Sequence, residues 1–176
     1  QQAAEMLGTL AKLLRYSIQY GDSSVGILED DLEYLCDYLG LQKARFEERL
    51  TWEFDISEKA QTCTVPKLLL QPIVENCIQY GFQDEAVLHI LIEARIMGDD
   101  LVISVKDNGS GIDQEMIDKI ERQWKDPEAG VSQQHIGLTN TYKRIKLHFG
   151  QDSGLTVTGR KDEGTTTIKS GGWCEE

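Results

Sequence analysis

Two amphipathic segments open the chain before any alternating pattern begins. Each carries an apolar stripe at spacings of three and four residues, made by Leu7, Leu10, Leu14 and Ile18 in the first and by Leu28, Leu32, Leu35 and Leu39 in the second. This spacing predicts two helices, separated by the Gly-Asp-Ser-Ser break over residues 21–24. The stripes pack either on the core of the domain that follows or in a dimeric helical bundle, and the spacing does not choose between them.

From Leu50 the period of the apolar positions changes to two. Four apolar residues alternate with polar ones, which predicts a half-buried strand over 50–56. Proline is favoured in the first turn of a helix, so Pro66 and the apolar run after it predict a helix over 66–81. The later pattern predicts, in order, strands over 88–97 and 101–106 with a turn at 98–100, a helix over 113–123, a mobile polar loop over 124–136, a helix over 137–148 and strands over 155–159 and 165–169.

This order of elements predicts the α+β class. Neighbouring strands are joined by short turns, which favours antiparallel hairpins over a doubly wound parallel sheet. We therefore expect a two-layer α/β sandwich, with a mixed, mostly antiparallel sheet covered by helices on one face. Residues 1–48 would form a two-helix segment, residues 49–170 the folded domain and residues 171–176 a frayed tail.

The chain is acidic, with 30 Asp+Glu against 18 Lys+Arg and a formal net charge of -12 over 176 residues. This charge argues against broad binding to nucleic acid or to anionic membrane surfaces. It leaves room for a local anion site made of backbone N–H groups at a helix start. The stretch 129–170 reverses the sign, because its bases are Lys143, Arg144, Lys146, Arg160, Lys161 and Lys169 and its acids are Asp152, Asp162 and Glu163.

The cysteines and histidines suggest neither a disulfide framework nor a metal site. Cys36, Cys63, Cys77 and Cys174 include no C-x-x-C pair, and a chain of this size needs no disulfide. We therefore expect reduced thiols, as in a cytosolic protein. The histidines lie far from the cysteines in sequence, which disfavours a zinc site. No apolar run approaches the roughly 18 residues of a membrane span.

Three short features place polar groups where a ligand could use them. Asn76, beside Glu75, lies within an apolar helical pattern, and its amide oxygen is a hard neutral ligand suited to Mg²⁺. Asp107 ends a predicted strand and precedes two glycines that let the backbone approach a planar base. Gly137 opens the basic helix, where free N–H groups and the helix dipole favour anions.

Each feature also has a purely structural explanation. Asn76 could be satisfied by water, the Asp-Asn-Gly segment is a common turn, and a basic helix face is often only solvated. Their combination is more specific, because Asp107 lies 31 residues after Asn76 and Gly137 lies 30 residues after Asp107. Each stands at a junction or face that the predicted elements direct toward one site.

These segments resemble the motifs of LytS/YesM-type sensor histidine kinases. The stretch Leu-Leu-Gln-Pro-Ile-Val-Glu-Asn-Cys-Ile-Gln-Tyr-Gly at 69–81 resembles their N box. Asp-Asn-Gly-Ser-Gly-Ile at 107–112 resembles the first glycine box, and Ile-Gly-Leu-Thr-Asn at 136–140, with Arg144, the second. Residues 14–17 and 38–46 match the family's linker between the kinase helix and the catalytic domain, and residues 164–168 match its closing strand. The resemblance runs from about Leu7 to Lys169.

The resemblance implies the Bergerat-type ATP-binding fold that histidine kinases share with gyrase, Hsp90 and MutL, and it implies ATP and Mg²⁺ as cofactors. On this basis Asn76 holds Mg²⁺, and Glu75 is a weaker candidate for a base or orienting group. Asp107 accepts the adenine amino group. The other nucleotide contacts implied are Gly109, Gly111 and Ile112 around adenine, Gly137, Leu138, Asn140 and Arg144 at the phosphates, and Thr165 in the adenine water network. Residues 124–136 become the ATP lid.

The resemblance also implies partners and a location. The γ-phosphoryl group of ATP would pass to a histidine on the phosphoacceptor helix of the full-length chain, and then to a response regulator. The full-length protein would be a homodimer in the bacterial plasma membrane, anchored through segments missing here, with this domain on the cytoplasmic side. No nucleic-acid partner is expected.

The phosphoacceptor motif of the family, of the Pro-His-Phe-Leu-Phe-Asn type, does not occur in the sequence. His89, His135 and His148 all lack its context. We therefore expect a catalytic fragment that binds Mg·ATP and does not phosphorylate itself. Pro72 stands where gyrase-type ATPases carry a catalytic glutamate, which fits transfer to histidine rather than hydrolysis.

Other departures from the family pattern leave two alternatives open. Gln79-Tyr80 replaces a basic pair, His135 replaces a glycine, and Cys77 replaces a small residue such as alanine and is expected to pack as one. One alternative is a degenerate nucleotide-binding or scaffolding module without kinase activity. The other is a serine kinase of the anti-sigma type, against which the family-like linker at 38–46 argues.

Overall fold

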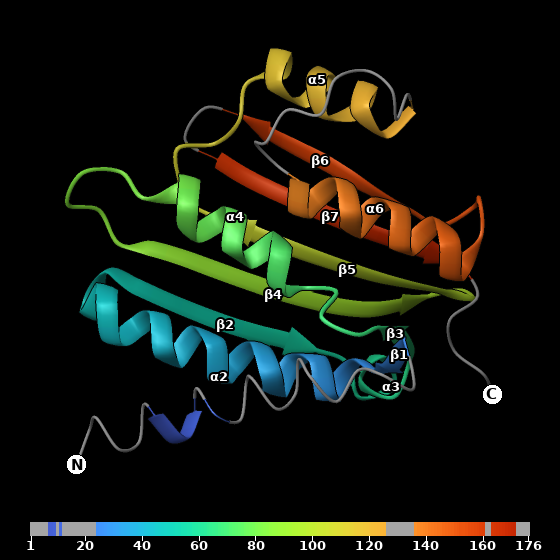
Figure 1. Cartoon of the computed structure of the whole chain (residues 1–176), viewed down its shortest axis with the longest axis horizontal. Helices are drawn as coiled ribbons and strands as arrows, with labels where there is room; N and C mark the ends of the chain where they lie inside the picture. The colour runs from blue at the N-terminus through green and yellow to red at the C-terminus, as the bar shows by residue number, and fades with distance from the viewer. Residues whose placement is uncertain (1–6, 10, 12–23, 126–135, 161–162, 172–176) are drawn as a thin grey trace.

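A five-stranded sheet in the order β2-β4-β5-β7-β6 is the frame of the molecule (Figure 1). The computed structural model describes residues 7–9, 11, 24–125, 136–160 and 163–171. The strands are β2 (Leu50–Ile56), β4 (Leu88–Met97), β5 (Asp100–Asp107), β6 (Gly154–Arg160) and β7 (Glu163–Gly171). β2 runs parallel to β4 and the other neighbours are antiparallel, so the predicted mixed sheet is confirmed.

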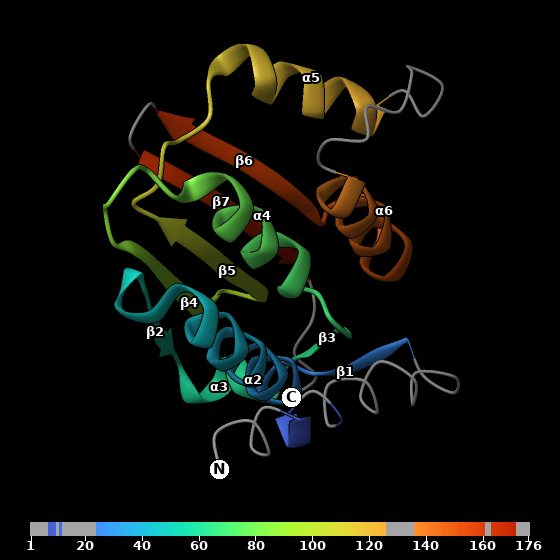
Figure 2. The same ribbon diagram turned by 60° about the vertical axis from the view of Figure 1, so that its left-hand side comes forward.

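Helices cover one face of this sheet, as predicted. α2 (Leu28–Phe46), α4 (Gln71–Gly81) and α6 (Ile136–Phe149) lie on the same side of it, and α5 (Gln114–Lys125) lies against β6 and α6 (Figure 2). A 3₁₀ turn (Glu47–Arg49) and the short α3 (Glu58–Gln61) flank β2. Within the described residues, no helix is long and apolar enough to cross a membrane.

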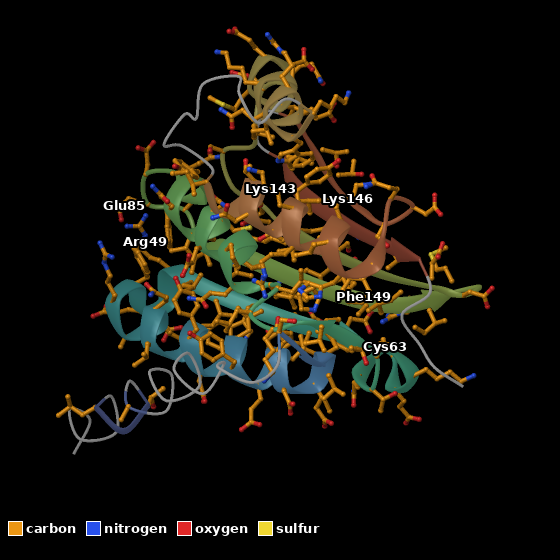
Figure 3. The ribbon with its side chains drawn as sticks, turned by 45° about the vertical axis from the view of Figure 1, so that its right-hand side comes forward. Arg49, Cys63, Glu85, Lys143, Lys146 and Phe149 are labelled. Atoms are coloured by element: carbon orange, nitrogen blue, oxygen red, sulfur yellow. The ribbon has the colours of Figure 1, made fainter. Side chains whose placement is uncertain are left out.

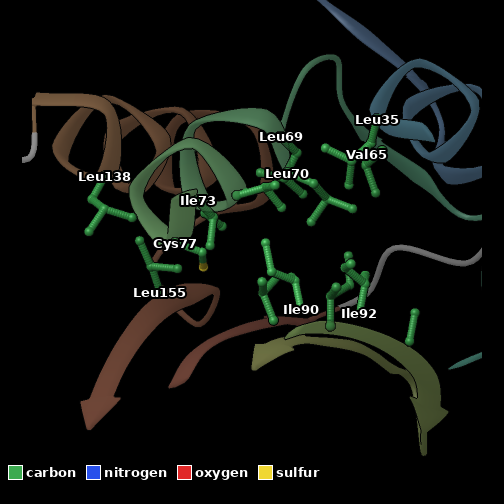
Figure 4. Packing of buried hydrophobic residues seen from close by; sticks show 14 of the residues in the cluster. Leu35, Val65, Leu69, Leu70, Ile73, Cys77, Ile90, Ile92, Leu138 and Leu155 are labelled. Carbon is green, nitrogen blue, oxygen red and sulfur yellow. The ribbon is translucent and has the colours of Figure 1, made fainter. Parts of the chain in front are cut away.

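The hydrophobic core lies between the sheet and these helices. Burial alternates along β4, because successive side chains of a strand point to opposite faces of the sheet. Its fully buried Ile90 and Ile92 point toward Leu70 and Ile73 at the start of α4 (Figure 4). Burying one such side chain contributes roughly 1.5–3 kcal/mol, so the core fixes the position of α4 on the sheet.

The apolar stripe of α2 packs on this same core. Leu28, Leu35 and Leu39 have no exposed surface and belong to one hydrophobic cluster with the sheet residues. Of the two explanations left open by the sequence, packing on the domain's own core therefore holds for α2. In the first amphipathic segment residues 7–9 and 11 are helical, and the rest of its stripe lies outside the described residues.

The predicted helix over 66–81 begins later than the sequence indicated. Residues Thr64–Pro66 form β3, which pairs antiparallel with β1 (Val25–Ile27) in a second, two-stranded sheet. Leu68 then has φ 54°, a conformation that a helix cannot contain. The helix starts at Gln71, with Pro72 in its first turn. A proline does lie in the first turn of this helix, but it is Pro72 and not Pro66 as predicted.

Both ends of the polar loop predicted over 124–136 are helical in the structure. α5 continues through Lys125 and α6 begins at Ile136, and the rest of the loop lies outside the described residues. The Trp124 ring stacks on the ring of Tyr142 in α6, with centroids 4.7 Å apart and planes 7° apart. This contact keeps Trp124 in the helix, because its ring is buried there.

The expectation that all cysteines are reduced is wrong for Cys63. Cys36 and Cys77 are free thiols, whereas Cys63 is disulfide-bonded. Cys36 is exposed on α2 and Cys77 is buried in α4. The absence of a C-x-x-C pair could not reveal this, because a disulfide depends on spatial proximity rather than on sequence spacing.

Candidate functional site

The tight loop that follows β5 is hydrogen-bonded to the end of α4. The backbone N–H of Ser110 donates to the Gly81 carbonyl at 3.2 Å, and its hydroxyl donates to the Tyr80 carbonyl at 2.7 Å. A Cβ on Gly109 would lie 2.4 Å from Gly81 Cα and 2.6 Å from the Gly81 oxygen. Only glycine therefore allows this approach of two backbones.

The Asp107 carboxylate lies at this junction and is held by the loop that follows it. Its Oδ1 accepts the backbone N–H of Gly109 at 2.9 Å. The buried Cys77 thiol of α4 is close enough to feel the charge of this carboxylate. Burial and then the charge of Asp107 raise the pKa of Cys77 well above its usual range.

Asn108 fastens the same loop to the start of β4. Its side-chain oxygen accepts the His89 backbone N–H at 2.7 Å, and its side-chain nitrogen donates to the Val87 carbonyl at 3.0 Å. From the sequence, Asn108 was expected only to form part of a turn, and Cys77 was expected only to pack in the core. The one available signal for Cys77 was its position one turn before Gly81 on the same helix face.

Asn76 and Glu75 lie in α4 and have different neighbours. The Asn76 side-chain nitrogen donates to the Pro72 carbonyl at 2.7 Å, which leaves the amide oxygen as its acceptor end. Glu75 Oε1 accepts the side-chain nitrogen of Gln71 at 2.7 Å. Burial and then the charge of Glu75 raise the pKa of Tyr38 in α2 to about 12. Glu75 is therefore close to α2, where its charge helps to raise the pKa of the Tyr34 and Tyr38 phenols.

The start of α6 approaches the start of α4 closely. A Cβ on Gly137 would lie 3.1 Å from Pro72 Cβ, so the glycine lets these two helix ends come together. The Thr139 hydroxyl, in the first turn of α6, is buried without a hydrogen-bond partner among the described residues. Leu138 is buried in the core and Asn140 is exposed. Lys143 projects from the outer side of the helix (Figure 3).

Arg144 in α6 contacts the segment before α4 and the start of α2. Its guanidinium donates to the Lys67 carbonyl and interacts with the charge of Asp31 in α2. Asp31 Oδ2 accepts the backbone N–H of Leu70 at 3.1 Å. Burial raises the pKa of Asp31 to about 6, although the neighbouring N–H groups and Arg144 offset part of the shift. This cluster joins α2, α6 and the segment before α4.

The remaining predicted positions lie around the Asp107 loop. Gly111 has φ 71°, which favours glycine, and Ile112 packs partly buried against the core. Thr165 in β7 pairs with Lys106, one position from Asp107. The structure thus gathers Asp107, Gly109 and the C-terminal half of α4, and it joins the first turns of α4 and α6.

The described residues hold no group of three or more His, Cys, Asp or Glu side chains that could bind a metal. Residues 64–169, which include Asn76, Asp107 and Gly137, match the family described as histidine kinase-, DNA gyrase B- and HSP90-like ATPase. The chain belongs to this ATPase family. Residues 1–50 match a second family, described as histidine kinase.

Curated relatives of this ATPase family member are sensor kinases. It is 32% identical over 169 residues to the sensor histidine kinase YesM of Bacillus subtilis, covering 96% of this chain and 27% of that protein. It is 33% identical over 150 residues to the sensor histidine kinase YpdA of Escherichia coli, covering 85% of this chain and 25% of that protein. The chain thus spans about a quarter of the length of these relatives.

Solved structures confirm the fold that the motifs implied. The catalytic domain of the histidine kinase ThkA superposes with a TM-score of 0.65 at 16% identity, covering 86% of this chain and 97% of that one. ThkA in complex with the response regulator protein TrrA gives a TM-score of 0.60 at 16% identity, covering 96% of this chain and 49% of that one.

Proposed function

We propose that this chain is the ATP-binding catalytic region of a sensor histidine kinase, which transfers the γ-phosphoryl group of ATP to a histidine outside the chain. The observation that carries the proposal is the Asp107 carboxylate, held by Gly109 against the helix that bears Asn76. The family to which the chain belongs and the curated relatives of the chain support the same activity.

The residues present fit Mg·ATP. After accepting the Gly109 hydrogen bond, the Asp107 carboxylate keeps lone pairs for an adenine amino group. Asn76 offers an amide oxygen, which is suited to Mg²⁺. The first turn of α6 offers its backbone N–H groups to an anion, together with the Thr139 hydroxyl, which has no hydrogen-bond partner among the described residues. Together these groups match the base, the metal and the phosphates of the nucleotide.

When bound, Mg·ATP supplies the phosphoryl group and the metal that neutralises its charge. The chain's own residues bind and orient it. Asp107 selects the base, Asn76 holds the metal, with Glu75 as a weaker candidate for assistance, and the start of α6 receives the phosphates beside Gly137. Pro72, which carries no acid or base, leaves no general base one turn before Asn76, which fits transfer to histidine over hydrolysis.

The partners belong to the same proposal. We expect the phosphoryl group to pass from the histidine to a response regulator, as the ThkA complex with TrrA suggests by analogy. We expect a homodimeric full-length protein, anchored in the membrane by segments outside this chain, because its curated relatives are named sensor kinases. The half-buried Arg144 remains a candidate phosphate contact only if it leaves Lys67 and Asp31.

Calorimetric titration of Mg·ATP into the wild type and Asp107→Asn tests the nucleotide assignment. Replacing the carboxylate should weaken binding roughly 10- to 100-fold, because a hydrogen bond to a charged group is lost. Asp99→Asn, which changes an exposed acid in the β4–β5 turn, is the matched control and should bind as the wild type does. Equal affinities for wild type and Asp107→Asn would contradict the assignment.

A longer chain that includes the upstream phosphoacceptor helix separates the kinase from the degenerate binding module. It should become phosphorylated on histidine when incubated with Mg·ATP. Binding without phosphorylation in that longer chain would favour the binding module instead.

A further inference from the structure

Two charged side chains from different helices hold the four-residue segment 67–70 that leads into α4. Asp31 comes from α2 and Arg144 comes from α6. We propose that both are positioning residues for the binding of Mg²⁺ with ATP, because they fix the segment from which α4 starts and thereby the place of Asn76. This inference rests on the proposed function and deepens it, and it gives Arg144 a part other than the phosphate contact that the resemblance implies.

Asp31 fixes the residue at which α4 begins. Its carboxylate is buried, and its Oδ2 accepts the backbone N–H of Leu70 at 3.1 Å. Leu70 is the N-cap of α4, and its carbonyl accepts the backbone N–H groups of Ile73 and Val74 at 3.1 and 3.0 Å. The backbone of one residue thus joins the carboxylate of α2 to the first turn of α4. Removing the carboxylate is costly, because a buried N–H that loses its acceptor stays desolvated.

Arg144 fixes the other end of the segment. Its guanidinium donates to the Lys67 carbonyl, three residues before the N–H that Asp31 binds. Between these two anchors Leu68 has φ 54°, which is unfavourable for a residue with a Cβ. Such a conformation persists only where the surrounding structure enforces it. The hydrogen bonds on both sides of Leu68 supply that constraint, so we expect the segment to relax when either charged side chain is removed.

The first turn of α4 in turn orients the candidate metal ligand. The Asn76 side-chain nitrogen donates to the Pro72 carbonyl at 2.7 Å, which leaves the amide oxygen as the end that can bind Mg²⁺. Pro72 lies two residues after the N-cap Leu70. A shift of the helix start therefore moves the group that orients Asn76.

The other end of α4, next to the candidate adenine contact, has anchors of its own. Ser110 in the loop after β5 donates from its backbone N–H to the Gly81 carbonyl at 3.2 Å and from its hydroxyl to the Tyr80 carbonyl at 2.7 Å. Asp107 is bonded to the same loop. Loss of an anchor before α4 should therefore weaken the contribution of the metal and leave recognition of the base nearly intact.

The affinity for ATP with and without Mg²⁺ separates these two ends of the helix. Calorimetry measures it first with excess Mg²⁺ and then with EDTA. We expect Mg²⁺ to tighten ATP binding to the wild type, and we expect this gain to shrink about three- to tenfold in Asp31→Ala, the effect of disturbing one binding contact. Binding of ATP in EDTA should change by less than about twofold.

Two variants of α2 control this measurement. Asp31→Asn keeps an oxygen that accepts the Leu70 N–H and should recover the gain from Mg²⁺. Asp30→Ala changes an exposed neighbour in the same helix and should behave as the wild type does. Thermal unfolding checks that each variant is folded.

Hydrogen exchange in the nucleotide-free chain tests the positioning directly. The N–H groups of Ile73 and Val74, which are bonded to the N-cap carbonyl, should exchange roughly tenfold faster in Asp31→Ala and in Arg144→Met, because the first turn of α4 opens more often. Arg144→Met keeps an unbranched apolar side chain and removes the donor. The Ser110 N–H, at the other end of α4, should keep its wild-type rate. A role limited to contacting phosphate predicts no change before the nucleotide binds.

The outcomes separate this inference from the proposed function. If the wild type gains affinity from Mg²⁺ and Asp31→Ala keeps the full gain, Asp31 does not position the metal ligand, while the proposed function stands. Unchanged exchange in nucleotide-free Arg144→Met would overturn the part given to Arg144. If Asp31→Ala is not folded, the same two measurements on Arg144→Met decide the question. If the wild type binds ATP under neither condition, the proposed function fails and this inference fails with it.

Discussion

Asp31 offers a sharp test of how the structure links its elements, because its carboxylate is 2% exposed and bonds to the segment before α4. Burial raises its pKa to about 6 in the folded chain, from an ordinary value of 3.8. The folded state therefore binds this proton more tightly than the unfolded state does. The stabilising contribution is fully present below pH 3.8 and is lost as the pH rises through 6.

The size of the effect follows from the shift in pKa. A shift of about two units corresponds to roughly 3 kcal/mol over the whole range, at 1.36 kcal/mol per unit. Between pH 5 and pH 7 the same relation gives roughly 1.3 kcal/mol. At pH 5 the Asp31 carboxyl is mostly ionised in the unfolded chain and mostly protonated in the folded one, and at pH 7 it is mostly ionised in both. This window avoids acid unfolding of the other carboxylates.

The substitution Asp31→Asn removes the titration while keeping an oxygen that accepts the Leu70 N–H. Urea unfolding at pH 5 and pH 7 gives the free energy of unfolding of each protein. The stability of the wild type relative to Asp31→Asn should fall by roughly 1.3 kcal/mol from pH 5 to pH 7. Asp30→Asn changes an exposed neighbour in the same helix and should show no such pH dependence against the wild type.

Two outcomes of this measurement would contradict a raised pKa for Asp31 in the folded chain. A difference between the wild type and Asp31→Asn that stays constant from pH 5 to pH 7 would mean that Asp31 titrates alike in both states. A wild type that gains stability relative to the variant as the pH rises would reverse the sign, and would mean that Arg144 and the N–H groups outweigh burial.

Two further predictions follow from the site. Gly109→Ala should lower the free energy of unfolding by several kcal/mol and weaken Mg·ATP binding, because the new Cβ would lie 2.4 Å from Gly81 Cα; urea unfolding and calorimetry measure both. Gly40→Ala, where a Cβ meets nothing within 4 Å, is the control, and equal stabilities for the two variants would contradict the packing of the loop. The 176-residue chain incubated with radiolabelled Mg·ATP should carry no acid-labile phosphate, and a clear phosphohistidine signal would overturn the expectation that its target histidine lies elsewhere.

Local patterns were enough for most of the fold. The alternation along β4 and β5 and the turn at Gly98, which has φ 68°, can all be recognised from neighbouring residues. The same holds for α2, whose leucine stripe needs only helical spacing. The candidate residues Asn76, Asp107 and Gly137 were also found locally, because each lies in a motif of a few residues.

Pairings between distant segments could not be found in this way. β3 pairs with β1, which lies about 40 residues earlier, so the short run at Thr64–Pro66 gave no alternation long enough to recognise. The direction of Arg144 toward Lys67 and Asp31 joins residues from α6, the segment before α4, and α2. A helical pattern shows that a residue lies on a helix, but it does not show which neighbour that residue meets.

Neighbouring residues along the chain are enough to predict most of the elements, the family-like motifs and the chemical types of the groups at the site. Which of those groups lie together depends on the tertiary fold. Cys77 is the clearest example, because its spacing within α4 predicts burial and nothing more. Only when β5 places Asp107 close to that helix does a negative charge help to raise the pKa of the buried thiol, since the interaction of two groups depends on their distance in space rather than on their separation along the chain.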